Sequence, residues 1–289
     1  QMVNVGASFG PLVMGKLRAM DWDLVFYVAA ATIGVMFLIT IFFYKEPERE
    51  IEGISIKQKF KDIWIALSDY KFAIFLVLLG IFFWLPFWAF FNLAAVYIDQ
   101  NLDTAVLYQN VRSVLGGFIT KIISREENGV WMINGEAIAH TGYIILIFQV
   151  FVSRIFEKRP ALPSFNLGMF IAAIGFAVIG LSRIAAPGWV FLGIFLFAVG
   201  EMISSPRIQE YITWIAPPEK AGLYMGTNFL ATFIGGALSG VIYTRLMGHF
   251  EIMNHPEYVM YTLAVHMILA IIAIYLFVRF LGDFKELDQ

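Results

Sequence analysis

The chain has 289 residues, of which 60% are hydrophobic and only 15% charged, and its formal net charge is −2. Soluble domains carry roughly a quarter of charged residues, so this composition excludes an ordinary soluble protein and predicts an integral membrane protein. The balanced charge gives no reason to expect a nucleic-acid partner, and the absence of cysteine excludes disulfides, thiol catalysis and cysteine metal sites.

Long apolar segments recur along the chain. A membrane-spanning helix needs about 20 residues, and these runs cannot be open strands, because an unpaired sheet edge finds no hydrogen-bond partner in lipid. We therefore predict an all-α fold, a polytopic membrane helix bundle surrounded by the lipid bilayer. The predicted spans cover residues 1–17 (incomplete), 24–43, 72–98, 140–156, 164–182, 189–214, 221–246 and 258–281.

The first span carries a glycine-rich motif. Residues 6–10 (GASFG) match the letters of the G-x-S-x-G nucleophile elbow, but that motif requires a strand–turn–helix context and His and acid partners. Gly6 and Gly10 instead predict close packing against another membrane helix, and Pro11 predicts a bend. Because the chain begins with Gln inside this segment, we expect it to be the C-terminal part of a longer protein.

Two polar segments interrupt the spans. In the linker 45–71, Ser55 can cap an amphipathic helix that lies along a membrane surface; an ordinary solvated linker is the alternative. In the loop 99–136, apolar residues recur at helical spacing, and Asn128-Gly129 indicates a small hairpin.

Lys and Arg are more numerous on the side of the linker and the C-terminus. The positive-inside rule then places this side in the cytoplasm and the loop 99–136 outside. We expect a multi-pass protein of the cell (inner) membrane with a cytoplasmic C-terminus.

Glu201 lies deep inside the apolar run 189–214. A carboxylate at that depth costs several kcal/mol unless it faces a partner or water, so an intramembrane acid indicates a functional group by default. Glu201 is our candidate for proton coupling. The alternative is a structural acid that is paired across helices.

Arg207 and Pro206 follow Glu201 in the same span. Arg207 can form a local ion pair with Glu210, or it can gate the cytoplasmic end or bind a substrate carboxylate. Pro206 frees a carbonyl in the preceding turn and predicts a kink, and broken helices often line transporter cavities.

Other polar and aromatic residues within the spans are candidates for a substrate-binding surface. Trp84, Trp88 and Asn92 repeat every four residues and share one helix face. A buried amide needs a protein or water partner, so packing between helices remains the alternative for this face. The substrate-binding candidates are Trp88, Asn92, Gln149, Tyr224 and Asn228.

Two further features concern packing. Gly235 and Gly236 predict a close contact between helices. His140 lies near the predicted outer surface, and we expect no special role for it.

The helix number and order, the Gly6-xxx-Gly10-Pro11 motif and the basic linker resemble the major facilitator superfamily of transporters. The resemblance covers the whole chain. It implies that residues 1–44 are the last two helices of an N-terminal half, that 45–71 is the cytoplasmic linker and that 72–289 is the six-helix C-terminal half of a twelve-helix fold. The rest of the N-terminal half of the same chain is then the missing partner.

Within that superfamily, short stretches resemble the proton-dependent oligopeptide transporters. Residues 3–8 (VNVGAS) are similar to that family's fifth-helix I-N-x-G-S stretch, and Gly200-Glu201 is similar to its tenth-helix G-E motif. The resemblance implies that Glu201 takes part in proton coupling and in holding a peptide's amino terminus. Residues 225–229 (MGTNF) depart from the family's M-G-x-W-F stretch, because Asn228 replaces Trp.

Together these features predict a secondary active, proton-coupled transporter of a small solute, with peptides or amino-acid-like compounds as its small-molecule substrate. The proton is the coupling ion, no other cofactor is expected, and no enzyme motif is indicated. The alternatives are a proton-driven antiporter or drug exporter, and a non-transporting scaffold or receptor with the same fold.

Overall fold

The computed structural model describes residues 2–45, 55–217, 220–282 and 284. Seven helical segments in this part of the chain are long and apolar enough to cross a membrane, which confirms the predicted all-α membrane bundle. These segments are Trp22–Phe43, Tyr70–Asn101, Gly135–Phe156, Ala161–Ile184, Trp189–Ile215, Ala221–Ile252 and Tyr258–Leu281. The predicted incomplete span 1–17 forms a helix too, but it is not one of the seven.

The described residues form helices and one hairpin. In chain order they are α1 (Met2–Met20), α2 (Trp22–Phe43), α3 (Ile56–Ser68), α4 (Tyr70–Leu78), the π-helix η1 (Leu79–Trp84), α5 (Leu85–Asn101), α6 (Thr104–Ile122), β1 (Ser124–Glu127), β2 (Val130–Ile133), α7 (Gly135–Ile138), α8 (Gly142–Phe156), α9 (Ala161–Ile184), α10 (Trp189–Ile215), α11 (Ala221–Ile252) and α12 (Tyr258–Leu281).

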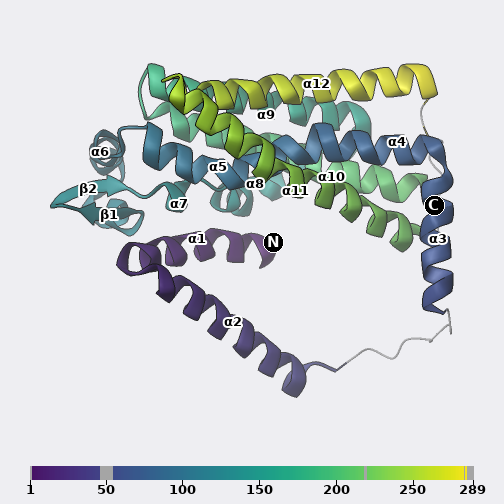
Figure 1. Cartoon of the computed structure of the whole chain (residues 1–289), viewed down its shortest axis with the longest axis horizontal. Helices are drawn as coiled ribbons and strands as arrows, with labels where there is room; N and C mark the ends of the chain where they lie inside the picture. Colours follow the sequence, from purple (N-terminus) through teal and green to yellow (C-terminus); the bar gives the residue numbers. More distant parts are fainter. Residues whose placement is uncertain (1, 46–54, 218–219, 283, 285–289) are drawn as a thin grey trace.

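The long helices α8 to α12, together with the continuous segment α4–η1–α5, run side by side as a bundle (Figure 1). Helix α1 lies alongside this bundle and contacts α8, whereas α2 leaves it at an angle and buries none of its residues. Helix α3 crosses one end of the bundle, here called the α3 end, and α6 lies with the β1–β2 hairpin at the opposite, hairpin end.

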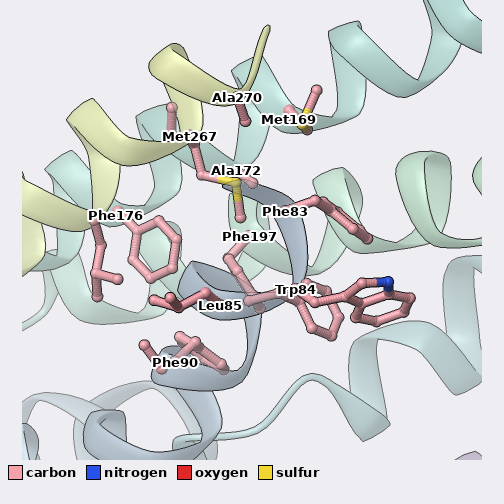
Figure 2. Close-up of a cluster of buried hydrophobic side chains, with 14 of the residues drawn as sticks. Phe83, Trp84, Leu85, Phe90, Met169, Ala172, Phe176, Phe197, Met267 and Ala270 are labelled. Atoms are coloured by element: carbon pink, nitrogen blue, oxygen red, sulfur yellow. The ribbon is translucent and has the colours of Figure 1, made fainter. Parts of the chain in front are cut away.

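Aromatic side chains fill the centre of the bundle where η1, α5, α9, α10 and α12 meet (Figure 2). The rings of Phe90 and Phe197 stack with centroids 4.1 Å apart, and Phe83 meets Phe165 edge-on at 4.9 Å. These arrangements add to the energy of burial. The packed aromatic layer fixes the relative positions of the helices that carry the polar candidates.

The span Tyr70–Asn101 contains a π-helical turn that the sequence pattern did not predict. Pro86 follows this turn and has no N–H to donate to the carbonyl of the preceding turn. The widened turn Leu79–Trp84 precedes it and brings Trp84 and Leu85 against α11. Single π turns of this kind are frequent at functional sites.

The predicted amphipathic helix in the linker is present as α3. The Ser55 side chain caps it by accepting a hydrogen bond from the Gln58 N–H at 3.2 Å. Phe60 and Trp64 are 67% and 74% exposed, as expected for a helix that rests on a membrane surface. Residues 46–54 of the predicted linker lie outside the described residues.

The predicted hairpin forms at the opposite end. Strands β1 and β2 pair in antiparallel register around Asn128 and Gly129, whose φ angles of 51° and 79° fit the two-residue turn that Asn-Gly favours. Before the hairpin, α6 is broken at Gly116, where φ is 76°, a conformation that glycine adopts without steric cost.

Gly235 and Gly236 provide a test of the helix contact that they predict. A Cβ on Gly235 would lie 2.5 Å from the Trp84 Cβ, whereas a Cβ on Gly236 would make ordinary contacts with the Trp88 ring at 3.7 Å. We expect Gly235→Ala to lower the free energy of unfolding by about 1–3 kcal/mol through overpacking. Gly236→Ala is the matched control and should leave thermal unfolding in detergent nearly unchanged; equal effects of the two would contradict the contact.

Candidate functional site

Close packing on one face of α10 directs Glu201 toward α8. A Cβ on Gly200 would lie 2.5 Å from the Gly168 carbonyl oxygen, so α9 contacts α10 at this level. The next residue, Glu201, accepts a hydrogen bond from the Thr141 hydroxyl, with 2.6 Å between Oγ1 and Oε2. The Glu201 side chain is only half-buried, and it forms no ion pair with a basic residue in the described part of the chain.

Helix α1 crosses α8 next to this hydrogen bond. Ser8 is fully buried, and its Oγ would lie 2.7 Å from a Cβ placed on Gly142, the residue after Thr141. The Ser8 hydroxyl is satisfied within α1, since it donates to the Asn4 carbonyl at 2.7 Å. Glu201 therefore lies beside the contact between α1 and the C-terminal bundle. Neither Thr141 nor Ser8 was among the predicted site residues.

Toward the α3 end, Arg207 and Gln149 line a common hollow of about 350 Å³ between α8 and α10. Arg207 forms the ion pair with Glu210 that the i,i+3 spacing predicts, and Gln149 donates a hydrogen bond to the Ser153 hydroxyl at 2.9 Å. Arg207 is six residues from Glu201 on the same helix, a rise of roughly 9 Å. Glu201 therefore lies nearly two helical turns from the hollow along α10.

Pro206 lies next to Arg207 and is exposed, and α10 remains helical through it. Pro206 cannot donate to the Met202 carbonyl, which loses its usual helical partner. Its predicted part in gating stays a prediction.

Trp84, Trp88 and Asn92 share one face, as their spacing predicts, and this face lies against α11. Asn92 donates a hydrogen bond to the buried Ser239 hydroxyl at 2.8 Å, and Trp88 lies over Gly236. Asn92 is nevertheless exposed and Trp88 half-buried, and the Trp88 Nε1–H has no partner among the described residues. The face therefore contributes to packing, with Asn92 at an open surface and the Trp88 Nε1–H enclosed.

Tyr224 and Asn228 lie in a different environment. Tyr224 packs against Phe72, with ring centroids 4.6 Å apart, and Phe72 lies in the first turn of α4. Asn228 is buried, and its side-chain oxygen has no partner among the described residues. Neither residue lines the hollow that contains Arg207, and substrate binding by them stays a prediction.

Gly6 and Gly10 face open space, because a Cβ on either would meet no described atom within 4 Å. Pro11, in the same helix, is half-buried. By contrast, a Cβ on Gly15 would lie 2.6 Å from the Asn134 Nδ2. Helix α1 therefore touches the bundle at Ser8 and Gly15, and packing at Gly6 and Gly10 stays a prediction.

A charge network at the hairpin end joins α1 to the bundle. Asp99 accepts hydrogen bonds from Arg18 at 3.1 Å, from Arg125 at 2.9 Å and from the Gly135 N–H at 2.7 Å, and Arg18 also pairs with Glu136 at 3.0 Å. The Asp99 side chain is only 11% exposed. This network could not be predicted from the sequence, since its members lie in α1, α5, β1 and α7 and share no spacing.

A second network at the same end links α9 to the start of α12. Arg183 and His255 both bond to Glu257, at 2.8 Å and 2.9 Å. Burial raises the pKa of the Glu257 carboxyl, but the hydrogen bonds from His255 and from its own backbone N–H, together with Arg183, bring the pKa below its ordinary value of 4.5.

This lowered pKa predicts a pH dependence of stability. A carboxylate with a depressed pKa stabilises the folded state above its unfolded value, near 4.5, and loses that contribution as the pH falls through the folded-state pKa. We expect Glu257→Gln to lower the free energy of unfolding at pH 7 by about 1–3 kcal/mol, and the difference should shrink in acid. Thermal unfolding from pH 7 to pH 3 measures this, with the exposed Glu251→Gln as control. A difference that persists unchanged at pH 3 would contradict the assignment.

Comparison of the sequence with known protein families shows which family the chain belongs to. The sequence profile of the Major Facilitator Superfamily matches residues 2–240. The chain belongs to the Major Facilitator Superfamily. This is a superfamily of transporters and not of enzymes, and the seven candidate spans agree with a multi-pass membrane protein.

Relatives within the superfamily are peptide transporters. The chain is 25% identical over 162 residues to dipeptide and tripeptide permease A of Erwinia pyrifoliae, a match that covers 52% of this chain and 33% of that protein. Two solved structures of POT family transporters share the fold at 16% identity, with TM-scores of 0.54 and 0.52, and each match covers 91% of this chain and 55% of theirs. One was determined with a thioalcohol-conjugated peptide and the other with 5-aminolevulinic acid. The chain thus spans about half the length, or less, of these relatives.

Proposed function

We propose that the chain is part of a proton-coupled secondary transporter that imports peptides or amino-acid-like compounds. Glu201 would load and release the coupling proton. Trp88, Asn92, Gln149, Tyr224 and Asn228 would contribute one side of the substrate cavity, and the other side would come from the N-terminal half.

The observation that carries the proposal is the environment of Glu201. It is an acid within an apolar span, it has one hydroxyl partner, Thr141, and it forms no ion pair with a described cation. A carboxyl group fixed in a structural role would be expected to have a charged partner or to be fully enclosed. Glu201 is instead only partly enclosed, beside the α1–α8 crossing, where movement of α1 can change its access to water.

The substrate class rests on the relatives. The curated relative is a dipeptide and tripeptide permease, and the solved POT transporters hold a conjugated peptide and 5-aminolevulinic acid. Two basic groups line the α8–α10 hollow, Arg154 and Arg207. Arg154 is two residues from the end of its span, whereas Arg207 lies eight residues inside the end of Trp189–Ile215. A substrate carboxylate can compete with Glu210 for its guanidinium.

Uptake into liposomes tests the proposal. The complete protein is reconstituted, an inward proton gradient is imposed, and radiolabelled dipeptides and tripeptides are compared with single amino acids. We expect accumulation of a peptide above its external concentration, and its collapse when a protonophore is added. Peptide uptake at the same rate with and without the proton gradient would refute the coupling. Accumulation of amino acids but not of peptides would refute the peptide specificity.

A proton-driven antiporter or drug exporter is the second candidate, because Gly6, Gly10 and Pro11 form the glycine–proline motif that favours it. In that case an outward flux of substrate would be driven by an inward proton gradient. The same liposomes, loaded with substrate, distinguish the two directions. A non-transporting scaffold or receptor would give no flux in either direction.

We infer that the protein resides in the cell (inner) membrane with its C-terminus in the cytoplasm, on the distribution of Lys and Arg. Residues 285–289 lie outside the described residues. The exposed apolar surface of α2 and the open face at Gly6 and Gly10 would pack against the N-terminal half or lipid.

A further inference from the structure

Two adjoining apolar hollows lie at the hairpin end between α6, α8 and α10. The larger, of about 300 Å³, is lined by α6 residues including Val111, Val114 and Leu115. The smaller, of about 210 Å³, reaches toward α8. Both are bounded by Ile123 and Phe191. We call the two hollows together the α6 groove.

A buried polar group lines the α6 groove at its inner part. His140 is 8% exposed and lines the smaller hollow. Apart from a weak interaction with the Ala137 carbonyl, neither ring nitrogen has a hydrogen-bond partner in the described part of the chain. An unpaired buried polar group costs free energy, so a ligand that pairs with His140 would be favoured. The sequence alone predicts no special role for this residue.

The groove continues the apolar surface of the bundle. Leu192 and Phe195 of α10 and Phe148 of α8 are exposed apolar residues on membrane spans, and surfaces of this kind face acyl chains. Helix α6 is seen end-on in Figure 1, so it crosses the direction of the spans, as a helix in the plane of the membrane does. Val114 and Phe118 on α6 are 80% and 81% exposed, which is typical of an interfacial helix.

We propose that the α6 groove binds one membrane phospholipid, with an acyl chain between α6 and α10 and an ester carbonyl that accepts a hydrogen bond from His140. Because α6 lies at the hairpin end of the bundle and α10 is a candidate membrane span, α6 would lie at the level of the headgroups and α10 would enter the hydrocarbon region. The proposal does not depend on proton coupling or on the substrate.

The charges on α6 favour an anionic headgroup. Arg112 is exposed and forms no ion pair with a described acid. Lys121 is exposed, and its ammonium group lies over the Trp131 ring at 5.1 Å. A cation–π contact at an exposed site is weak, so a phosphate can compete for this group. Each basic side chain near an anionic lipid surface increases binding by about fivefold.

Photolabelling of the complete protein in nanodiscs tests the site. The probe is a phosphatidylglycerol that carries a diazirine on one acyl chain, and labelled peptides are identified by mass spectrometry. The internal control is a second apolar hollow of about 310 Å³ between α9 and α12, lined by Phe170 and Ala264 among other apolar side chains. We expect labelling at Val111–Leu115 and Phe191 to exceed labelling of the control hollow. Equal labelling of both would overturn the proposal, because it would indicate ordinary contact with bulk lipid.

Two variants sharpen the test. Leu115→Trp fills the groove from a half-exposed position and should abolish the excess labelling, while the thermal unfolding temperature shows that the bundle is intact. His140→Phe keeps a ring and removes both nitrogens, so we expect labelling to fall about threefold to tenfold. If neither variant changes the labelling, the groove is not the binding site. Equal labelling by phosphatidylcholine would overturn the headgroup preference.

Discussion

Replacement of Glu201 by Gln should abolish proton-driven accumulation of substrate while leaving the fold intact. Gln has nearly the same shape, and its side-chain oxygen can still accept the hydrogen bond that Thr141 donates at 2.6 Å. The amide cannot bind and release a proton, so the proton gradient can no longer drive substrate accumulation. We expect uptake against a concentration gradient to fall by at least about tenfold, which corresponds to roughly 1.4 kcal/mol of lost coupling.

The measurement is the ratio of internal to external substrate in liposomes with and without an inward proton gradient. Glu126→Gln is the matched control, because Glu126 is an exposed carboxyl on β1 far from the span. If Glu201→Gln still accumulates substrate in response to the gradient, Glu201 is not the coupling group. Thermal unfolding of the variant separates a loss of coupling from a loss of structure.

The Thr141 hydroxyl offers an independent test of the same site. Thr141→Val keeps the side-chain shape and leaves the Glu201 carboxyl without its observed partner, whereas Thr141→Ser keeps the donor. Losing a partner at a buried group costs about 1–3 kcal/mol. Coupled uptake should therefore be impaired in the Val variant and largely restored in the Ser variant. A purely steric role for Thr141 would give the opposite order.

Features that depend on one segment at a time could be predicted from the sequence. The apolar run 189–214 appears as α10, Trp189–Ile215, because the length of a spanning helix follows from bilayer thickness. The Ser55 cap and the Asn128-Gly129 turn also depend only on neighbouring residues. Glu201 could be singled out because its cost depends on its depth in the membrane, which the flanking apolar residues indicate.

Features that depend on distant segments could not be predicted. Thr141 lies 60 residues from Glu201 and Asp99 lies 81 residues from Arg18, and no periodicity connects them. The π turn before Pro86 depends on the closeness of Gly235 on α11 as well as on the proline. Asn228 is another example. A polar side chain within an apolar span suggests a cavity position, whereas the packing of α11 buries Asn228.

The charge network around Asp99 should control opening at the hairpin end. Arg18 belongs to α1, whereas Asp99, Arg125 and Glu136 belong to elements that follow the linker. In alternating access, the two halves must separate at one end while they close at the other. Separation at this end has to break the contacts of Arg18 with Asp99 and Glu136.

Asp99→Asn removes the charge at the centre of this network and keeps the size of the side chain. Arg18 and Arg125 then lose their shared carboxylate in a largely buried position, where breaking an ion pair costs several kcal/mol. The arginines are 25% and 18% exposed, so we expect solvent to reduce the effect to about 2 kcal/mol, equivalent to a shift of roughly 30-fold toward the open arrangement.

Accessibility of Ser8 reports this shift, because Ser8 is fully buried at the α1–α8 crossing, and this part of the chain contains no native cysteine. The rate of maleimide labelling of Ser8→Cys should rise by about 30-fold when Asp99→Asn is added. Glu127→Gln is the matched control, since Glu127 is 57% exposed and only 3.6 Å from Arg125, a geometry that contributes little. If Asp99→Asn and Glu127→Gln label at the same rate, the network does not hold α1 against the bundle, and closure at this end must come from the close contacts of Ser8 with Gly142 and of Gly15 with Asn134.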